Sequence, residues 1–447
     1  MMPIAQLKTF ASFGLILGAS LNNGRIAQRL KLPSITGFLL TGLLAGPWVL
    51  GMLNSDQVTS LQPIDHISLS FIALVAGSEL KLSDLKAQLR ATLSVMLGLT
   101  LATFTLTSLT AYLLSPWIPV LGQSTSVELI CAAVLLGVIM VARSPSAAIA
   151  MIGELKAKGP FTQLILGVTV LMDVVVITLF AAALSLSKSL TLGQAISFDF
   201  IKGIMGELTL SAGIGSLLFL MLRHVLRAPL PKLIRAISLL SLSAGTFYLS
   251  ESLHHSEFTI AGISPHFDPL LACLITGMWI KNAQSGETAS LHRFEAHVAE
   301  LSPWIYLVFF TVTGASLKLD LLAVVWPLAL VFFVIRLLGL GIGATLGGVI
   351  SGEPSQQHSY RWMGFVTQAG VGLGLAKRVA TEFPSWGPSL ATLIIGVIVM
   401  NELLGPLFFK RAIIRSGEAQ QESEGDSLDR NTSSKVKLPS CAETIKG

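Results

Sequence analysis

The sequence predicts an all-α polytopic membrane protein with about 13 transmembrane helices, built from two inverted repeats. Three observations indicate this class: the composition, the number of long apolar stretches and an internal repeat. Of the 447 residues, 52% are hydrophobic and only 12% are charged, and the mean hydropathy is +0.72. Ordinary soluble domains carry about 25% charged residues. The composition therefore excludes a soluble enzyme, a nucleic-acid-binding protein and a disordered chain.

Thirteen stretches are long and apolar enough to cross a bilayer, which requires about 20 residues per helix. The eighth and ninth are the least regular, because polar residues interrupt them. The chain after Ile414 is polar, so we expect residues 415–447 to form a disordered tail. The predicted spans are 4–23, 33–53, 64–82, 91–114, 127–152, 161–186, 203–223, 233–251, 260–280, 299–317, 321–350, 361–382 and 388–410.

The basic residues predict the orientation of these spans. The first span has no basic leader or small-residue cleavage site, so we expect it to be retained. If the N-terminus lies outside, 18 basic residues fall in the inner loops and 6 in the outer ones. Short cytoplasmic loops are enriched in Lys and Arg. We therefore expect an integral membrane protein with the N-terminus outside and the C-terminus in the cytoplasm.

An internal repeat relates the second and third spans to the ninth and tenth. Thr41-Gly42 matches Thr276-Gly277 at an offset of 235 residues, and Gly77 matches Gly314 at 237, with Leu-Lys-Leu nearby in both. The matching spans are seven apart, an odd number, so the halves have opposite orientations. Inverted repeats of this kind are typical of secondary transporters.

The fifth span is interrupted near its middle by Arg143-Ser144-Pro145-Ser146. Pro145 removes a backbone donor and disturbs the preceding turn, and the two serines offer hydroxyl groups at the break. In the corresponding twelfth span, Thr367 and Gln368 precede Gly370 and Gly372, which weaken a helix. Paired polar breaks are a good indication of a transporter's binding site. Close helix packing or a proline kink is the alternative explanation for each break alone.

Three charged residues lie at membrane depth. Asp173 lies well inside the sixth span, where a carboxylate is costly and usually marks an ion or proton pathway. Such a group can hold either a proton or a metal cation; a structural hydrogen-bond partner is the alternative. Arg336, in the eleventh span, must face a carboxylate, carbonyl groups at a helix C-terminus or water. Arg143 either holds the unwound backbone or balances Asp173, and the sequence favours neither role.

Other polar residues suit structural roles. Asp268, followed by a proline, is typical of a helix N-cap. Glu79 and Glu402 lie near predicted span ends, where solvation is expected. We predict no cofactor and no metal site, and no catalytic pair or metal motif of an intramembrane enzyme is present in the sequence. One group has metal-type ligands but no recognisable spacing, so a polar loop is expected and a pH sensor is the alternative: His254, His255, Glu257, His266 and Asp268.

Five runs resemble the cation:proton antiporter superfamily, in its bacterial sodium/hydrogen exchanger (antiporter-2) branch. The likeness extends from about residue 5 to 414 and includes motifs of both halves. The runs are LPSITGFLLTGLLAGPWVLG (32–51), SPSAAIAMIGEL (144–155), GVTVLMDVVVI (167–177), FFTVTGASLKLD (309–320) and MNELLGPLFFKRAI (400–413).

This resemblance implies the sodium/proton antiporter fold: two inverted six-helix repeats with crossed discontinuous helices. It also implies a homodimer in the inner membrane of a bacterium. A transporter domain (1–414) would divide into a scaffold (1–82 and 233–317), a linker helix (203–223) and a mobile ion-transporting core (91–186 and 321–410).

By position, Asp173 matches the family's ion-binding aspartate, Ser144 and Pro145 match its helix break, and Arg336 matches its basic residue in the eleventh span. With the breaks included, we expect Ser144, Thr367, Gln368 and Asp173 to bind the ion or proton, and Arg143 and Arg336 to supply supporting charge. The expected partners are H⁺ and a monovalent cation: Na⁺, K⁺ or Li⁺.

Two positions depart from the family pattern. Met172 occupies the place where the family often has a second acid, asparagine or glutamine, and a thioether is a poor ligand for hard cations. Arg143 replaces the usual threonine of the break. One acid and a fixed arginine predict electroneutral 1:1 exchange, and the mobile core that the resemblance implies predicts an elevator-like alternating-access cycle. An anion-coupled carrier or a cation channel on the same scaffold remains the alternative function, and a receptor with vestigial transport is a third.

Overall fold

The structure, a computed structural model, describes residues 4–118, 124–192, 199–255, 267–283, 288–353, 355–368 and 370–419. Within these ranges it is helical and contains no strand. The first half comprises α1 (Ile4–Arg29), α2 (Ser34–Ala45), α3 (Ser55–Ser60), α4 (Gln62–Glu79), α5 (Leu82–Ala87), α6 (Leu89–Leu113), η1 (Ser115–Trp117), α7 (Ser126–Val141), α8 (Pro145–Glu154), α9 (Pro160–Leu192) and α10 (Asp199–Arg227). The second half comprises α11 (Lys232–His255), α12 (Pro269–Asn282), α13 (Thr288–Ser316), α14 (Leu319–Ser351), α15 (Ser355–Arg361), η3 (Trp362–Phe365), α16 (Gly370–Glu382) and α17 (Gly387–Ser416).

Each of the 13 predicted spans corresponds to a helix or to a broken pair of helices. Eight segments of the described chain, counting α7 and α8 together, are long and apolar enough to cross a bilayer. The fifth span is divided into α7 and α8, and the twelfth into η3 and α16. α2 ends at Ala45, earlier than predicted, because Pro47 favours an extended conformation at Gly46, whose φ and ψ are −66° and 176°.

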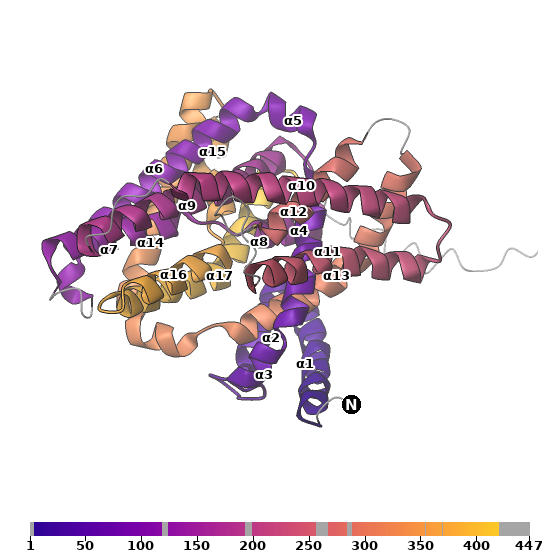
Figure 1. The fold of residues 1–447 in the computed structure, drawn as a ribbon, viewed down its shortest axis with the longest axis horizontal. Coiled ribbons are helices and arrows are strands. Elements are labelled where there is room, and N and C mark those ends of the chain that lie inside the picture. Colours follow the sequence, from indigo (N-terminus) through magenta and orange to yellow (C-terminus); the bar gives the residue numbers. More distant parts are fainter. Residues whose placement is uncertain are drawn as a thin grey trace, which may run out of the picture.

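The helices pack in two groups, which Figure 1 shows on opposite sides of the molecule. In one group α1 and α13 pack on α2, and α12 packs on α4. In the other, α14 packs on α6 and α17, while α7 contacts both α6 and α9. The long helix α10 packs mainly against α12 and also contacts α9. The groups also touch where α4 contacts α8 and where α2 contacts α17.

The repeat seen in the sequence appears as one helix contact made twice. Gly42 of α2 and Gly314 of α13 each lie against a backbone carbonyl of the other helix. Gly77 of α4 and Gly277 of α12 make the same reciprocal contact. A Cβ atom at any of the four positions would collide with that carbonyl. The matched glycines of the two repeats thus set the close approach of α2 to α13 and of α4 to α12, which confirms the predicted repeat.

The segment after α17 contacts the start of α9. The carboxylate of Glu418 accepts hydrogen bonds from the backbone N–H groups of Phe161 and Thr162, both at 2.8 Å, and from the Thr162 hydroxyl at 2.7 Å. A carboxylate is favourable here because the first turn of a helix leaves its N–H groups unpaired. Residues 415–419, which we expected in the disordered tail, are therefore structured: they complete α17 and cap the start of α9. Residues 420–447 lie outside the described chain.

Candidate functional site

The first break lies between α7, which ends at Val141, and α8, which begins at Pro145. Ser144 has an extended backbone and is the N-cap of α8, its hydroxyl accepting a hydrogen bond from the N–H of Ala147 at 3.3 Å. The hydroxyl groups of Ser144 and Ser146 lie 3.2 Å apart. Pro145 at the first helical position needs no hydrogen-bond partner. The predicted break is therefore a helix end followed by a new helix start.

The second break precedes the glycines rather than falling on them. Val366, Thr367 and Gln368 are not helical, and Gly370 is already the first residue of α16. Gly372 lies within α16, where it allows close approach to Gln368. The two breaks meet directly, because the N–H of Ser144 donates to the carbonyl of Thr367 at 3.1 Å.

Arg336 of α14 joins the two breaks and is fully buried. Its guanidinium donates to the Met140 carbonyl at 3.0 Å, the Ala142 carbonyl at 3.0 Å and the Val366 carbonyl at 2.8 Å. These carbonyls belong to the ends of α7 and η3, where backbone acceptors lack helical partners and carry partial negative charge. From the sequence we expected Arg336 to face a carboxylate, helix C-terminal carbonyls or water. In the structure its backbone partners are carbonyls at helix C-termini.

Gln368 and Asn401 extend this network to α17. The Gln368 amide donates to the Ile139 carbonyl at 2.8 Å, and its oxygen accepts from Asn401 at 3.2 Å. Asn401 also accepts from Arg336 at 2.8 Å. Neither Thr367 nor Gln368 lines the cavity described below, so their role as ion ligands stays a prediction. Asn401 was not among the expected site residues; its signal was an amide inside the apolar run of the last span.

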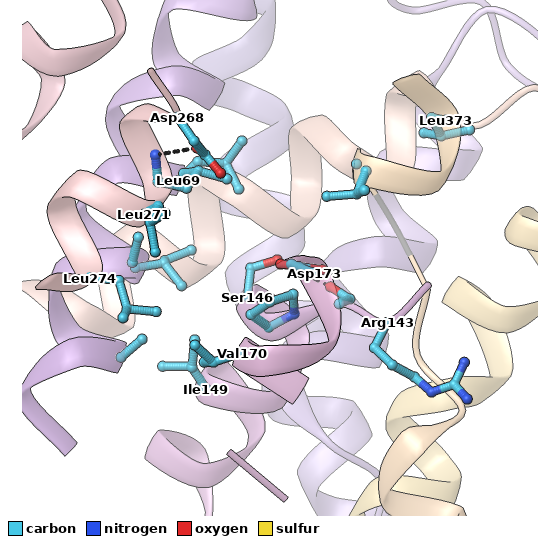
Figure 2. A pocket seen from close by; sticks show the side chains of 18 of the residues that line it. Leu69, Arg143, Ser146, Ile149, Val170, Asp173, Asp268, Leu271, Leu274 and Leu373 are labelled. Carbon is cyan, nitrogen blue, oxygen red and sulfur yellow. Dashed lines mark hydrogen bonds between the residues drawn. The ribbon is translucent and has the colours of Figure 1, made fainter. Parts of the chain in front are cut away.

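Arg143 is 1% exposed and donates to the carbonyls of Met140, at 3.3 Å, and Ala142, at 3.0 Å. Two of its three guanidinium nitrogens, Nε and Nη2, have no hydrogen-bond partner within the described residues. Figure 2 shows its guanidinium pointing away from Asp173. Of the two expected roles, the contacts favour holding the unwound backbone over neutralising the aspartate.

A cavity of about 280 Å³ lies beside the crossing of the two breaks. Its walls come from both helix groups and are mostly apolar, with the start of α8 and the start of α16 at one side. Arg143 is the only cation among the lining residues that the structure describes. Five carboxylates line it: Asp65, Asp173, Glu207, Asp268 and Glu402. This excess of acid favours cations over anions inside the cavity.

Asp173 faces this cavity from near the middle of α9. Its Oδ1 atom is buried and accepts no hydrogen bond within the described residues. Figure 2 shows its carboxylate next to Ser146, with Asp268 on another wall. Asp268 is the N-cap of α12, as expected, and accepts from the Leu270 N–H at 2.8 Å. Asp173 therefore has a carboxylate oxygen without a described partner, while Asp268 is partly occupied by its own helix.

Three acids of the cavity were not recognised as site residues from the sequence. Asp65 lies in the first turn of α4, and Glu207 lies in α10. Glu402 was expected to be solvated near a span end, but it is 8% exposed and α17 continues to Ser416. The missed signal was its position well inside the last predicted span.

Met172 does not line the cavity. Its side chain is fully buried and its sulfur accepts a 3.4 Å hydrogen bond from Thr100 of α6. The methionine next to Asp173 therefore packs between helices and does not contact the cavity space. Within the part of the chain that the structure describes, no three His, Cys, Asp or Glu side chains converge on a possible metal position. The lining carboxylates are thus distributed around the walls.

Helix ends supply the remaining electrostatics. Ser144, Pro145 and Gly370, at the N-terminal ends of α8 and α16, line the cavity, so partial positive charge faces the carboxylates. The opposite ends, at α7 and η3, are covered by Arg336. This arrangement can hold one or a few small cations or protons on carboxylates without a permanent counter-ion.

Comparison with known proteins places these features in a family. The model of the sodium/hydrogen exchanger transmembrane family matches residues 13–413. The Na⁺/H⁺-K⁺ antiporter GerN of Bacillus cereus is 24% identical over 432 residues, covering 94% of this chain and 100% of that protein. The probable Na⁺/H⁺ antiporter GerT of Bacillus cereus is 24% identical over 331 residues, covering 73% and 79%.

Among solved structures, the sodium proton antiporter MjNhaP1 from Methanocaldococcus jannaschii at pH 8 is similar in fold, with a TM-score of 0.67 and 20% identity. The match covers 93% of this chain and 99% of that one. At this identity the likeness concerns the fold, two inverted repeats with crossed broken helices.

Proposed function

Because the chain belongs to the transmembrane sodium/hydrogen exchanger family, we propose that it is a secondary antiporter that exchanges a monovalent cation for protons by alternating access. The observation that carries this proposal is Asp173, a carboxylate near the middle of α9 with an unpartnered buried oxygen in an acidic cavity. A proton and a cation compete for such a group. Exchange then follows from competition, without a separate coupling device.

The substrate is proposed to be Na⁺ or K⁺. Two relatives carry Na⁺/H⁺ in their names, and one also carries K⁺. A hard cation prefers oxygen ligands, which the carboxylates and the Ser144 and Ser146 hydroxyls near the cavity supply. If Asp173 alone changes occupancy, one cation is exchanged for one proton and transport is electroneutral.

The two helix groups support an elevator-like cycle. The first group carries Asp173, the breaks and Arg336, and it consists of α6, α7, α9, α14 and α17. The second group consists of α1, α2, α4, α12 and α13. We propose that the first group (91–186 and 321–410) moves against the second (1–82 and 233–317), with the 203–223 helix as linker. Arg336 would keep both breaks together during this motion.

We also propose a homodimer formed through the second group, in a bacterial inner membrane with the N-terminus outside. The 18 to 6 distribution of loop basic residues supports the orientation. Single cysteines in the loops, labelled from one side in right-side-out vesicles, test it.

Proton flux in proteoliposomes tests the function. Purified protein is reconstituted with a pH-sensitive dye inside, and NaCl, KCl, LiCl or choline chloride is added outside. We expect wild-type flux with Na⁺ or K⁺ and none with choline, and no flux for Asp173→Asn. Cation-driven flux that persists in Asp173→Asn would overturn the assignment. Uptake of an organic anion, or single-channel currents, would instead identify the anion-coupled carrier or the channel.

A further inference from the structure

A second carboxylate of the cavity has no counter-charge in contact with it among the described residues. Glu402 of α17 is 8% exposed and lines the cavity, and its Oε2 atom has no hydrogen-bond partner within the described residues. The described salt bridges do not include it. A buried, unpaired carboxylate is costly. It therefore needs either a permanent proton or a bound cation.

Glu402 and Asp173 lie at similar depths in the corresponding last helices of the two repeats. α9 is the sixth span and α17 the thirteenth, so they are partners in the repeat. Asp173 lies 13 residues after the first residue of α9, and Glu402 lies 15 residues after the first residue of α17. Each helix packs on a broken helix, α9 on α8 and α17 on α16. Both repeats thus present one carboxylate from the middle of their last helix to the same cavity.

The groups around Glu402 favour a cation. From the other walls Asp65, Asp173, Glu207 and Asp268 face the same space, against a single arginine. That arginine is bonded to the carbonyls of its own break and points away from Asp173. Asp65 comes from α4, in the opposite helix group, so Glu402 and Asp65 approach the cavity from its two sides.

We propose that Glu402, together with Asp65, forms a second binding site for a hydrated monovalent cation, separate from the site at Asp173. The proposal rests on the proposed antiport and extends it from one cation position to two. A volume of about 280 Å³ has room for an ion and several waters. No three acids converge on one point in the described chain, so the site lacks the several protein oxygens that a dedicated Ca²⁺ site uses.

The site at Glu402 belongs to both helix groups, unlike the site at Asp173. Glu402 lies on α17 and Asp65 on α4, and these helices belong to the groups that we propose to move relative to each other. A cation held between them can bind only while the groups are arranged as in this structure. The second site is therefore a loading site, which raises the local cation concentration beside Asp173.

Thermal unfolding of the purified full-length protein, titrated with NaCl or KCl at pH 8.5, tests the second site. Choline chloride at equal concentration controls for ionic strength. A ligand that binds only the folded protein raises Tm in a saturable manner. We expect Asp173→Asn to retain a saturable rise of a few degrees. Adding Glu402→Gln should abolish the rise, and adding Asp65→Asn should weaken the apparent affinity by about tenfold.

Matched variants on the Asp173→Asn background separate binding from folding. Glu300→Gln removes a carboxylate of an exposed pair with Lys232 and should leave the rise unchanged. Glu402→Asp keeps the negative charge and should show the rise in Tm that Glu402→Gln abolishes. The transition itself reports that each variant folds. An Asp173→Asn protein without a cation-specific rise overturns the second site, as does a rise that survives Glu402→Gln. Antiport fails separately, if wild-type vesicles show no cation-driven proton flux.

Discussion

The guanidinium of Arg336 and the side-chain oxygen of Asn401 lie 2.8 Å apart, and this pair connects α14 to α17 beneath the two helix breaks. Asn401 donates a hydrogen bond to Gln368, whose amide in turn donates to the Ile139 carbonyl of α7. One buried network of hydrogen bonds therefore joins α7, α14, α17 and the second break. Asn401 enters this network, while the next residue, Glu402, faces the cavity.

Replacing Arg336 with methionine should strongly destabilise the protein. Four buried acceptors each lose a hydrogen bond: three backbone carbonyls and the Asn401 oxygen. The Met140 and Ala142 carbonyls keep their bonds from Arg143. Each unsatisfied buried group costs about 1–3 kcal/mol, so the two remaining acceptors predict a loss of about 2–6 kcal/mol. Denaturation in detergent measures it. Arg378→Met, at an exposed position, is the control; equal stability of the two variants would exclude the structural role.

Replacing Met172 with leucine should leave cation-driven proton flux within about twofold of wild type. The methionine is buried against Thr100 and does not line the cavity, and a swap of similar volume costs less than about 1.5 kcal/mol. The proteoliposome assay checks the flux at several cation concentrations. A changed apparent KM for the cation, with unaltered stability, would show that the position contributes to the ion site after all.

Gly77→Ala and Gly277→Ala should each destabilise the protein by about 1–3 kcal/mol, because the added methyl group meets a backbone carbonyl of the facing helix. The two effects should be similar, since the residues make reciprocal contacts. Gly213→Ala, where nothing lies within 4 Å, is the matched control and should be neutral or stabilising. Thermal unfolding in detergent compares the three variants, and equal midpoints would argue against this close contact.

Glu418→Ala should weaken the start of α9 by about 0.5–2 kcal/mol, the usual contribution of a helix cap. Three donors at Phe161 and Thr162 lose their acceptor. Glu418→Gln keeps one acceptor oxygen and should lose less. Hydrogen exchange at the first turn of α9 measures the effect locally. Unchanged protection in the alanine variant would mean that water replaces the cap at no cost.

Several features of this protein follow from the sequence alone. The 12% charged fraction and the apolar runs determine a polytopic helical protein, since every backbone group in lipid must be paired within its own helix. The Gly42/Gly277 and Gly77/Gly314 matches determine the repeat. Asp173 is identified because a carboxylate inside an apolar run has no cheap structural explanation. Each of these features belongs to a single segment of the chain or to a comparison of two segments. Composition and sequence pattern are therefore enough to identify them.

Only the tertiary structure decides which side chains share a space. Asp65 lies early in α4 and Glu402 in the middle of α17, and no spacing in the chain brings them to one cavity. It also assigns Arg336 to carbonyl groups instead of to a carboxylate, and it places neither Thr367 nor Gln368 among the lining residues of the cavity. Hydrogen bonds and charge interactions act over a few ångströms between segments hundreds of residues apart, so their partners are fixed by packing.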